Sequence, residues 1–67
     1  MGNATIAAPV RITIQEFAER EGIALSTARL WIRKGIAPPS YQLAGFRRVM
    51  DLDAVIRWEN DLKANAQ

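Results

Sequence analysis

Two short amphipathic segments lie only three residues apart, and this spacing constrains the fold more than any other feature of the sequence. Residues 14–21 and 25–34 each place apolar side chains on one face at helical spacing. A glycine follows each segment, Gly22 and Gly35, and glycine readily adopts the left-handed conformation that ends helices. Because three residues cannot form a long loop, we expect two helices that meet at a sharp corner.

The first segment carries a helix start signal, and the second has two chemically different sides. The hydroxyl of Thr13 can accept from the amide of Glu16, whose carboxylate can reach back to the amide of Thr13. We therefore expect helices over Ile14–Glu21 and Leu25–Lys34. The second helix then has an apolar side opposite a largely polar and basic side. The first consists of Leu25, Ala28, Trp31 and Ile32, and the second of Ser26, Arg29, Leu30 and Arg33.

The middle of the chain predicts a β-hairpin. Pro38-Pro39 prevents the second helix from continuing, because proline lacks the amide hydrogen that a helix interior needs. Tyr41–Leu43 and Phe46–Met50 are rich in residues that favour strands. Ala44-Gly45 lies between them and suits a short turn, so the two segments are expected to pair.

A third helix is expected at the C-terminal end, with Asp51 as its cap and residues 52–63 as its span. The predicted fold class is mainly α with a small β-hairpin, in the order helix, tight turn, helix, hairpin, helix. Residues 12–63 form the domain, 1–11 a flexible arm and 64–67 a frayed tail. The predicted core consists of Phe17, Ala18, Ile23, Ala28, Trp31, Ile32, Val49, Val55 and Trp58.

Charge is segregated along the chain, although the net charge is only +2. From Gly22 to Val49 there are five basic residues and no acidic ones, whereas the remainder holds four basic and seven acidic residues. A block of one sign between segments of the other sign is typical of a surface that faces phosphates. The alternative is a solvated basic face with no ligand.

Several functional classes lack the residues they need. The chain has no cysteine and no histidine, no nucleophile beside a base and no glycine-rich phosphate loop. We also expect no room for a pocket of about 300 Å³, the lower end of the usual range for small-molecule sites. The sequence therefore predicts neither an enzyme nor a metal or cofactor site. The absence of a membrane-length apolar run or a signal peptide favours a cytoplasmic location, with no membrane partner.

The spacing of small and apolar residues from Gln15 to Ile32 resembles the helix-turn-helix signature. The matching pattern is Gln15-x-x-Ala18-x-x-x-Gly22-Ile23-x-x-x-Thr27-Ala28-x-x-Trp31-Ile32. Residues 12–58 as a whole resemble the winged helix-turn-helix domains of phage excisionases (recombination directionality factors) and MerR-like regulators. The features that carry this resemblance are Gly22, Arg33-Lys34-Gly35, Pro38-Pro39, Gly45, Arg47-Arg48 and Trp58.

Two positions depart from that family pattern. Ala24 stands where a Ser or Thr cap is common, which predicts a weaker start of the second helix. Glu21 stands where an apolar residue is common, which predicts less complete packing of the first helix. Neither departure removes the basic face of the second helix.

The resemblance implies a double-stranded DNA interface with two parts. A recognition helix would enter the major groove, where arginine can bind guanine and Leu30 can meet a thymine methyl. A hairpin wing would lie along the neighbouring minor groove or backbone. The predicted recognition-helix residues are Ser26, Thr27, Arg29, Leu30, Arg33 and Lys34, and those of the wing are Arg47 and Arg48. Consecutive strand residues face opposite ways, so only one of the two wing arginines is expected to face the groove squarely.

The same resemblance implies a function in a bacterial host cell. An excisionase binds adjacent sites, bends DNA and helps a phage integrase to excise a prophage, and head-to-tail contacts between copies on DNA are expected. A small MerR-like transcriptional regulator is the first alternative. A protein-interaction module that uses the apolar Leu30 and Tyr41 is an alternative of another class. Trp31 and Trp58 are assigned to the core rather than to base stacking, and Lys34 can also serve the helix dipole.

Overall fold

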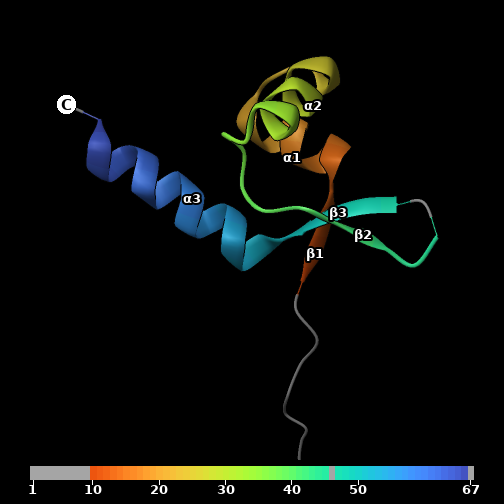
Figure 1. Ribbon diagram of the computed structural model, residues 1–67. Coiled ribbons are helices and arrows are strands. Elements are labelled where there is room, and N and C mark those ends of the chain that lie inside the picture. The colour runs from red at the N-terminus through yellow and green to blue at the C-terminus, as the bar shows by residue number, and fades with distance from the viewer. Residues whose placement is uncertain (1–9, 46, 67) are drawn as a thin grey trace, which may run out of the picture.

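The computed structural model describes residues 10–45 and 47–66 and contains three helices and a three-stranded antiparallel sheet (Figure 1). The predicted class, mainly α with a β-hairpin, is confirmed at this level. The elements in chain order are β1 (Arg11–Thr13), α1 (Ile14–Glu21), α2 (Leu25–Lys34), β2 (Tyr41–Leu43), β3 (Arg47–Asp51) and α3 (Leu52–Asn65).

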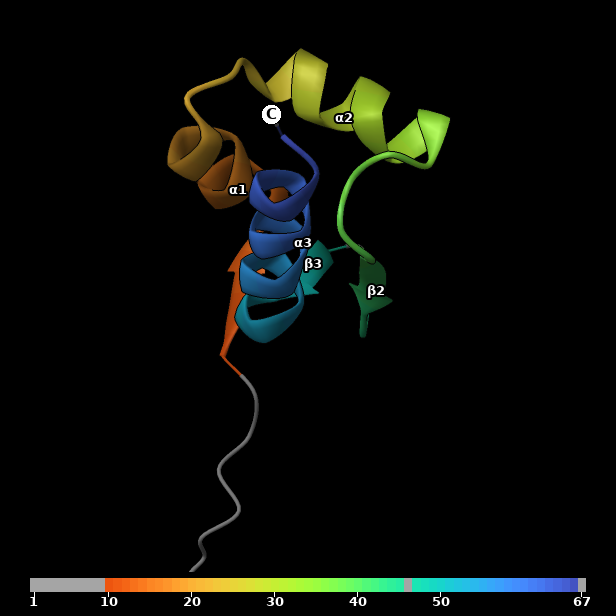
Figure 2. The ribbon, with the colours of Figure 1, turned by 90° about the vertical axis from the view of Figure 1, so that its left-hand side faces the viewer.

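The predicted boundaries of α1 and α2 are confirmed, and each has a local physical cause. At the start of α1, the amide of Glu16 donates to Thr13 Oγ1 at 3.0 Å, and the amide of Thr13 donates to Glu16 Oε1 at 2.8 Å. Gly22 and Gly35 end the two helices with φ of 73° and 77°, the left-handed region that disfavours other residues. Figure 2 shows the short turn that joins α1 to α2.

One strand was not predicted, and it shortens the expected arm. Arg11–Thr13 forms β1 and pairs antiparallel with β3, in the register Arg11 to Asp51 and Thr13 to Val49. The amide of Leu52 also donates to the carbonyl of Val10 at 2.8 Å. The expected flexible arm therefore does not include Arg11, and residues 1–9 lie outside the described part of the chain. A strand of three residues is too short to show a period, and its partner lies far along the sequence.

The strand β3 lies between β1 and β2, so both of its edges are paired. Met50 is fully buried in the main core, whereas Val49 is buried on the opposite face of the sheet. Tyr41 pairs with Val49, and its hydroxyl donates to Asp51 Oδ1 at 2.7 Å and accepts from Arg11 Nε at 2.8 Å. This chain of hydrogen bonds crosses the three strands on the side of Val49.

The core lies between α1, α2, β3 and the start of α3. Its buried members are Phe17, Ala18, Ala28, Met50 and Val55, with Ile12, Ile14, Ile23, Trp31, Ile32, Ala37 and Trp58 partly buried against them. All nine predicted core residues are buried or partly buried, and the buried residues that the prediction missed are Met50 and Pro38. Consecutive burial of Val49 and Met50 breaks the alternation that a strand with one solvated face would show.

Trp58 joins α3 to both of the other helices. Its ring meets Phe17 edge-on with the centroids 5.6 Å apart, and it lies 6.1 Å from Trp31. Its Nε1 donates to the carbonyl of Ile36 at 2.9 Å. The helix continues through Asn65, two residues past the predicted end, and its last turns are exposed and extend away from the rest of the molecule (Figures 1 and 2).

An ion-pair cluster fastens α1 to α3 beside this tryptophan. Arg20 donates from Nε to Glu59 Oε2 at 2.7 Å and from Nη2 to Glu59 Oε1 at 2.8 Å. These hydrogen bonds lower the pKa of Glu59 to about 2 and raise that of Arg20. Glu21 lies 3.8 Å from Arg20 with its side chain only 16% exposed, and its Oε2 is buried without a hydrogen-bond partner. Burial and the neighbouring Glu59 raise the pKa of Glu21 to about 7.

This cluster predicts that the free energy of unfolding depends on pH in two opposite ways. Glu59 is deprotonated more readily in the folded state, so its contribution is lost as pH falls from about 4.5 towards about 2. Glu21 holds its proton more tightly in the folded state, so stability falls as pH rises from about 4.5 to about 7. The cluster therefore contributes most to stability near pH 4.5, where Glu59 is charged and Glu21 still holds its proton in the folded state.

Replacing Glu21→Gln removes the second effect, because an amide carries no charge and can donate to Glu59. At about pH 8 we expect the free energy of unfolding to rise by about 1–2 kcal/mol, since one pKa unit corresponds to about 1.4 kcal/mol and the partial solvent exposure of Glu21 screens part of the penalty. At about pH 4 the variant and the original chain should differ little. Denaturant unfolding at both pH values measures this. The exposed Glu19→Gln on the same helix is the control, and an equal gain from both variants would contradict the assignment.

Candidate nucleic-acid interface

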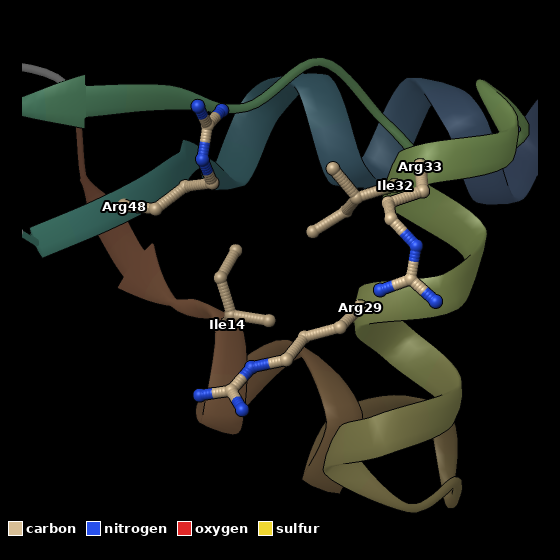
Figure 3. Close-up of a pocket in the computed structure, with 5 residues that line it drawn as sticks. All are labelled: Ile14, Arg29, Ile32, Arg33 and Arg48. Carbon is tan, nitrogen blue, oxygen red and sulfur yellow. The ribbon is translucent and has the colours of Figure 1, made fainter.

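A concavity of about 420 Å³ lies between α2 and the sheet, and it is the centre of the candidate interface (Figure 3). Its lining combines three arginines with two isoleucines: Arg29, Arg33 and Ile32 from α2, Arg48 from β3, and Ile14 from the start of α1. It is open to solvent, so it forms a basic hollow on the surface rather than an enclosed cavity.

Helix α2 turns its predicted contact side outwards. Ala28 is fully buried, and Trp31 and Ile32 are partly buried on the side that faces the core. Five of the six predicted recognition-helix residues are exposed, namely Ser26, Arg29, Leu30, Arg33 and Lys34, whereas Thr27 is half-buried. Packing of α2 across α1 therefore leaves a polar and basic surface with the apolar Leu30 in it.

The hairpin separates its two arginines, as strand alternation predicts. Arg48 pairs with Gln42 of β2 and lines the concavity, where its Nη1 donates to Ser40 Oγ at 2.9 Å. Arg47 pairs with Leu43 and belongs to the face of the sheet that carries Val49. The structure thus brings Arg48 together with Arg29 and Arg33, and it leaves Arg47 on the other face.

The hairpin turn itself is closed locally. Gly45 has φ of 94°, which suits glycine, and the side chain of Gln42 donates to its carbonyl at 3.2 Å. The predicted second strand began at Phe46, which lies outside the described residues, and β3 is described from Arg47. Tyr41, which was considered as an apolar contact residue, is partly exposed, but its hydroxyl is engaged by Asp51 and Arg11.

No carboxylate neutralises the concavity. Among residues 10–45 and 47–66, the ion pairs within 4.0 Å are those of Arg20 with Glu21 and Glu59, which join α1 to α3. The three arginines of the concavity therefore present their charges to solvent next to two partly buried isoleucines. Apolar walls beside unneutralised charge strengthen the local field, and the arrangement attracts anions.

Sequence reasoning missed three contributors to this hollow. Ile14 and Ile32, which line it, were expected only on the apolar faces of their helices, and Ser40, which contacts the lining Arg48, was given no role. The pairing of Ser40 with Arg48 connects residues on either side of the hairpin, and no sequence period signals such a contact.

The expectation that no hollow of about 300 Å³ would fit is wrong, because the concavity forms between elements rather than inside a core. Its lining holds arginine and isoleucine but no nucleophile or general base. Within the described part of the chain, no group of three or more acidic side chains is placed to hold a metal ion, and no helix is long and apolar enough to cross a membrane.

The start of α2 lacks the side-chain cap that Thr13 gives to α1. Ala24 occupies the cap position with extended backbone, φ −71° and ψ 152°, and no side chain accepts from the first amides of the helix. At the start of α3 Asp51 also makes no cap hydrogen bond, contrary to prediction, because its carboxylate accepts from Tyr41 instead.

We expect Ala24→Ser to stabilise the fold by about 1 kcal/mol, because the new hydroxyl can accept from an amide in the first turn of α2. Thermal and denaturant unfolding measure the change. Ala44→Ser places the same hydroxyl at an exposed position in the hairpin turn and should change stability by less than about 0.5 kcal/mol. Equal effects of the two variants would show that the start of α2 is not limited by capping.

Comparisons with known proteins add no relative to this description: no protein-family model, no curated protein and no solved structure matches the chain. The functional assignment therefore depends on the geometry of the interface and on the resemblance of its sequence pattern.

Proposed function

We propose that this chain is a sequence-specific double-stranded DNA-binding protein of the winged helix-turn-helix type. In this proposal α2 is the recognition helix and the β2–β3 hairpin is the wing. The observation that carries it is the common position of Arg29 and Arg33 of α2 and Arg48 of the hairpin around one hollow without acidic residues.

The dimensions of DNA support this assignment. The major groove is about 12 Å wide and admits one helix. Helix α1 packs across the inner side of α2, so the outer side is free to enter a groove while the hairpin follows the adjacent backbone. Ser26 and Thr27 at the start of α2 then lie where they can reach phosphates or base edges, Leu30 can meet a thymine methyl, and Lys34 can contact the backbone.

Within this class we propose an architectural role of the excisionase type. The domain is small and offers one helix and one hairpin to DNA, so it contacts few base pairs by itself. Useful specificity then requires copies on adjacent sites, with head-to-tail contacts between them, and bent DNA would allow a phage integrase to act. The proposed place of action is the bacterial cytoplasm, on DNA, without a catalytic step of its own.

The first test measures the affinity for duplexes from the genomic neighbourhood at about 50 and about 200 mM salt, where several neutralised phosphates should produce a large loss of affinity. The double variant Arg29→Ala and Arg33→Ala should bind roughly 100-fold more weakly at the lower salt concentration. The control is Arg57→Ala with Lys63→Ala, which removes the same charge from exposed positions on α3. Equal binding by both double variants would contradict the assignment of α2.

A second measurement separates the architectural role from simple regulation. If the excisionase role is correct, a permuted-site assay should detect bending at clustered sites that adjoin integrase sites. Binding without bending at a single promoter site would favour the regulator. Failure to bind any such duplex at about 50 mM salt would exclude both and favour a protein-interaction module.

A further inference from the structure

We propose that the concavity between α2 and the hairpin is a seat for a single phosphate group of the DNA backbone, held jointly by Arg29, Arg33 and Arg48. This inference rests on the proposed function and adds to it: the strand that separates the groove entered by α2 from the groove beside the hairpin would pass over this hollow. It assigns Arg29 and Arg33 to the backbone rather than to guanine edges.

The three arginines come from two separate elements and border the same space. Arg29 and Arg33 lie one helical turn apart on α2, and Arg48 borders the hollow from β3 on the other side, with its guanidinium pointing away from theirs in the free protein (Figure 3). Each guanidinium can donate two parallel hydrogen bonds to phosphate oxygens, a geometry that lysine cannot reproduce. A tetrahedral anion can accept from several such groups at once, whereas a flat base edge offers acceptors in one plane.

One of the three arginines is oriented before any ligand arrives. Arg48 Nη1 donates to Ser40 Oγ at 2.9 Å, and Ser40 follows Pro38-Pro39, of which Pro38 is buried. This contact uses one nitrogen and leaves the other donors of the guanidinium for an anion. Ser40 is therefore a positioning residue for Arg48, in a linker whose prolines restrict backbone freedom.

The surroundings favour an anion over water alone. Ile14 and Ile32 provide partly buried apolar walls, which lower the local dielectric and strengthen contacts between opposite charges. The described part of the chain supplies no carboxylate within 4.0 Å of any of the three arginines. A phosphate that enters the hollow therefore meets their positive charges without competition from a carboxylate of the described chain.

Sharing one phosphate has a thermodynamic consequence that separate contacts lack. Arginines that hold the same group depend on one another, so the losses from single substitutions should not multiply in the double variant. The salt dependence of the affinity should also indicate that the three arginines together neutralise one phosphate rather than three. Substitution of all three arginines by Ala should reduce the slope of log affinity against log salt by about 0.9, compared with about 2.7 for three independent phosphates.

The experiment is a double-mutant cycle on duplex binding by the full chain. We expect the double variant Arg33→Ala with Arg48→Ala to lose affinity by a factor at least about 3-fold smaller than the product of the factors lost by the two single variants. Arg33→Ala with Arg47→Ala is the matched control, and its losses should multiply because Arg47 lies on the other face of the sheet. The ratio of specific to non-specific affinity should stay unchanged in the triple variant, since backbone contacts carry no sequence information. Circular dichroism checks that each variant is folded.

Two further arms identify the source of the phosphate. Inorganic phosphate added to the free protein should shift the Nε–H NMR signals of Arg29, Arg33 and Arg48 along one binding curve, and leave those of Arg47 and Arg57 unmoved. A neutral methylphosphonate placed at successive backbone positions of the duplex should weaken binding at one position per site, and the triple variant should be insensitive to it. Shifts with inorganic phosphate but no sensitive backbone position would overturn the proposal and assign the hollow to a small phosphorylated ligand.

Failure of this inference is distinguishable from failure of the proposed function. Three results together would overturn the shared seat while retaining DNA binding by the original chain. The affinity losses of the single arginine variants would multiply in the double variant, the slope of log affinity against log salt would change by about 2.7 in the triple variant, and the specificity of the triple variant would be relaxed. If the unsubstituted chain binds no duplex, both the shared seat and the proposed function are overturned. Replacing Ser40→Ala should reduce the coupling between Arg33 and Arg48, and Ser40→Thr should restore it because it keeps the hydroxyl.

Discussion

The packing of Trp58 is the contact on which the arrangement of this small protein depends. Its ring lies against Phe17 of α1 and Trp31 of α2, and its indole nitrogen donates to the carbonyl of Ile36 in the linker after α2. One side chain on α3 therefore touches both helices of the corner and the segment that leads to the hairpin. Aromatic pairs of this kind add about 0.5–1.5 kcal/mol beyond the area they bury, which is substantial for a chain with few core residues.

The position of β3 between two other strands determines which arginine joins the basic side of α2. Its pairing with β1 and β2 fixes the register, and the buried Val49 and Met50 leave no freedom to shift it. A slip by one residue would bring Arg47 to the concavity and turn Arg48 away. The short strand β1, which has no visible function of its own, therefore contributes to the interface by holding the register of β3 from its other edge.

How much of this could be predicted from the sequence depends on the range of each contact. The ends of α1 and α2 were predicted because their signals are local: a capping box begins α1, and a glycine ends each helix. The strand β1 and the burial of Met50 could not be predicted, since both depend on pairing between distant segments. The cap expected from Asp51 failed for the same reason, because Tyr41 occupies its carboxylate from another strand. The charge block predicted a basic surface that faces phosphates. It did not predict that Arg48 rather than Arg47 would lie on the same side as the arginines of α2.

The distribution of charge connects these long-range contacts with the proposed activity. Acidic side chains that neutralise arginine lie at the junction of α1 and α3, where Glu59 binds Arg20 in two hydrogen bonds. At the other junction, between α2 and the hairpin, three arginines have no such partner in the described chain. Like charges that border one hollow attract an anion more strongly than a single exposed arginine does. A hollow whose arginines meet no carboxylate of the described chain is explained if an external anion completes it.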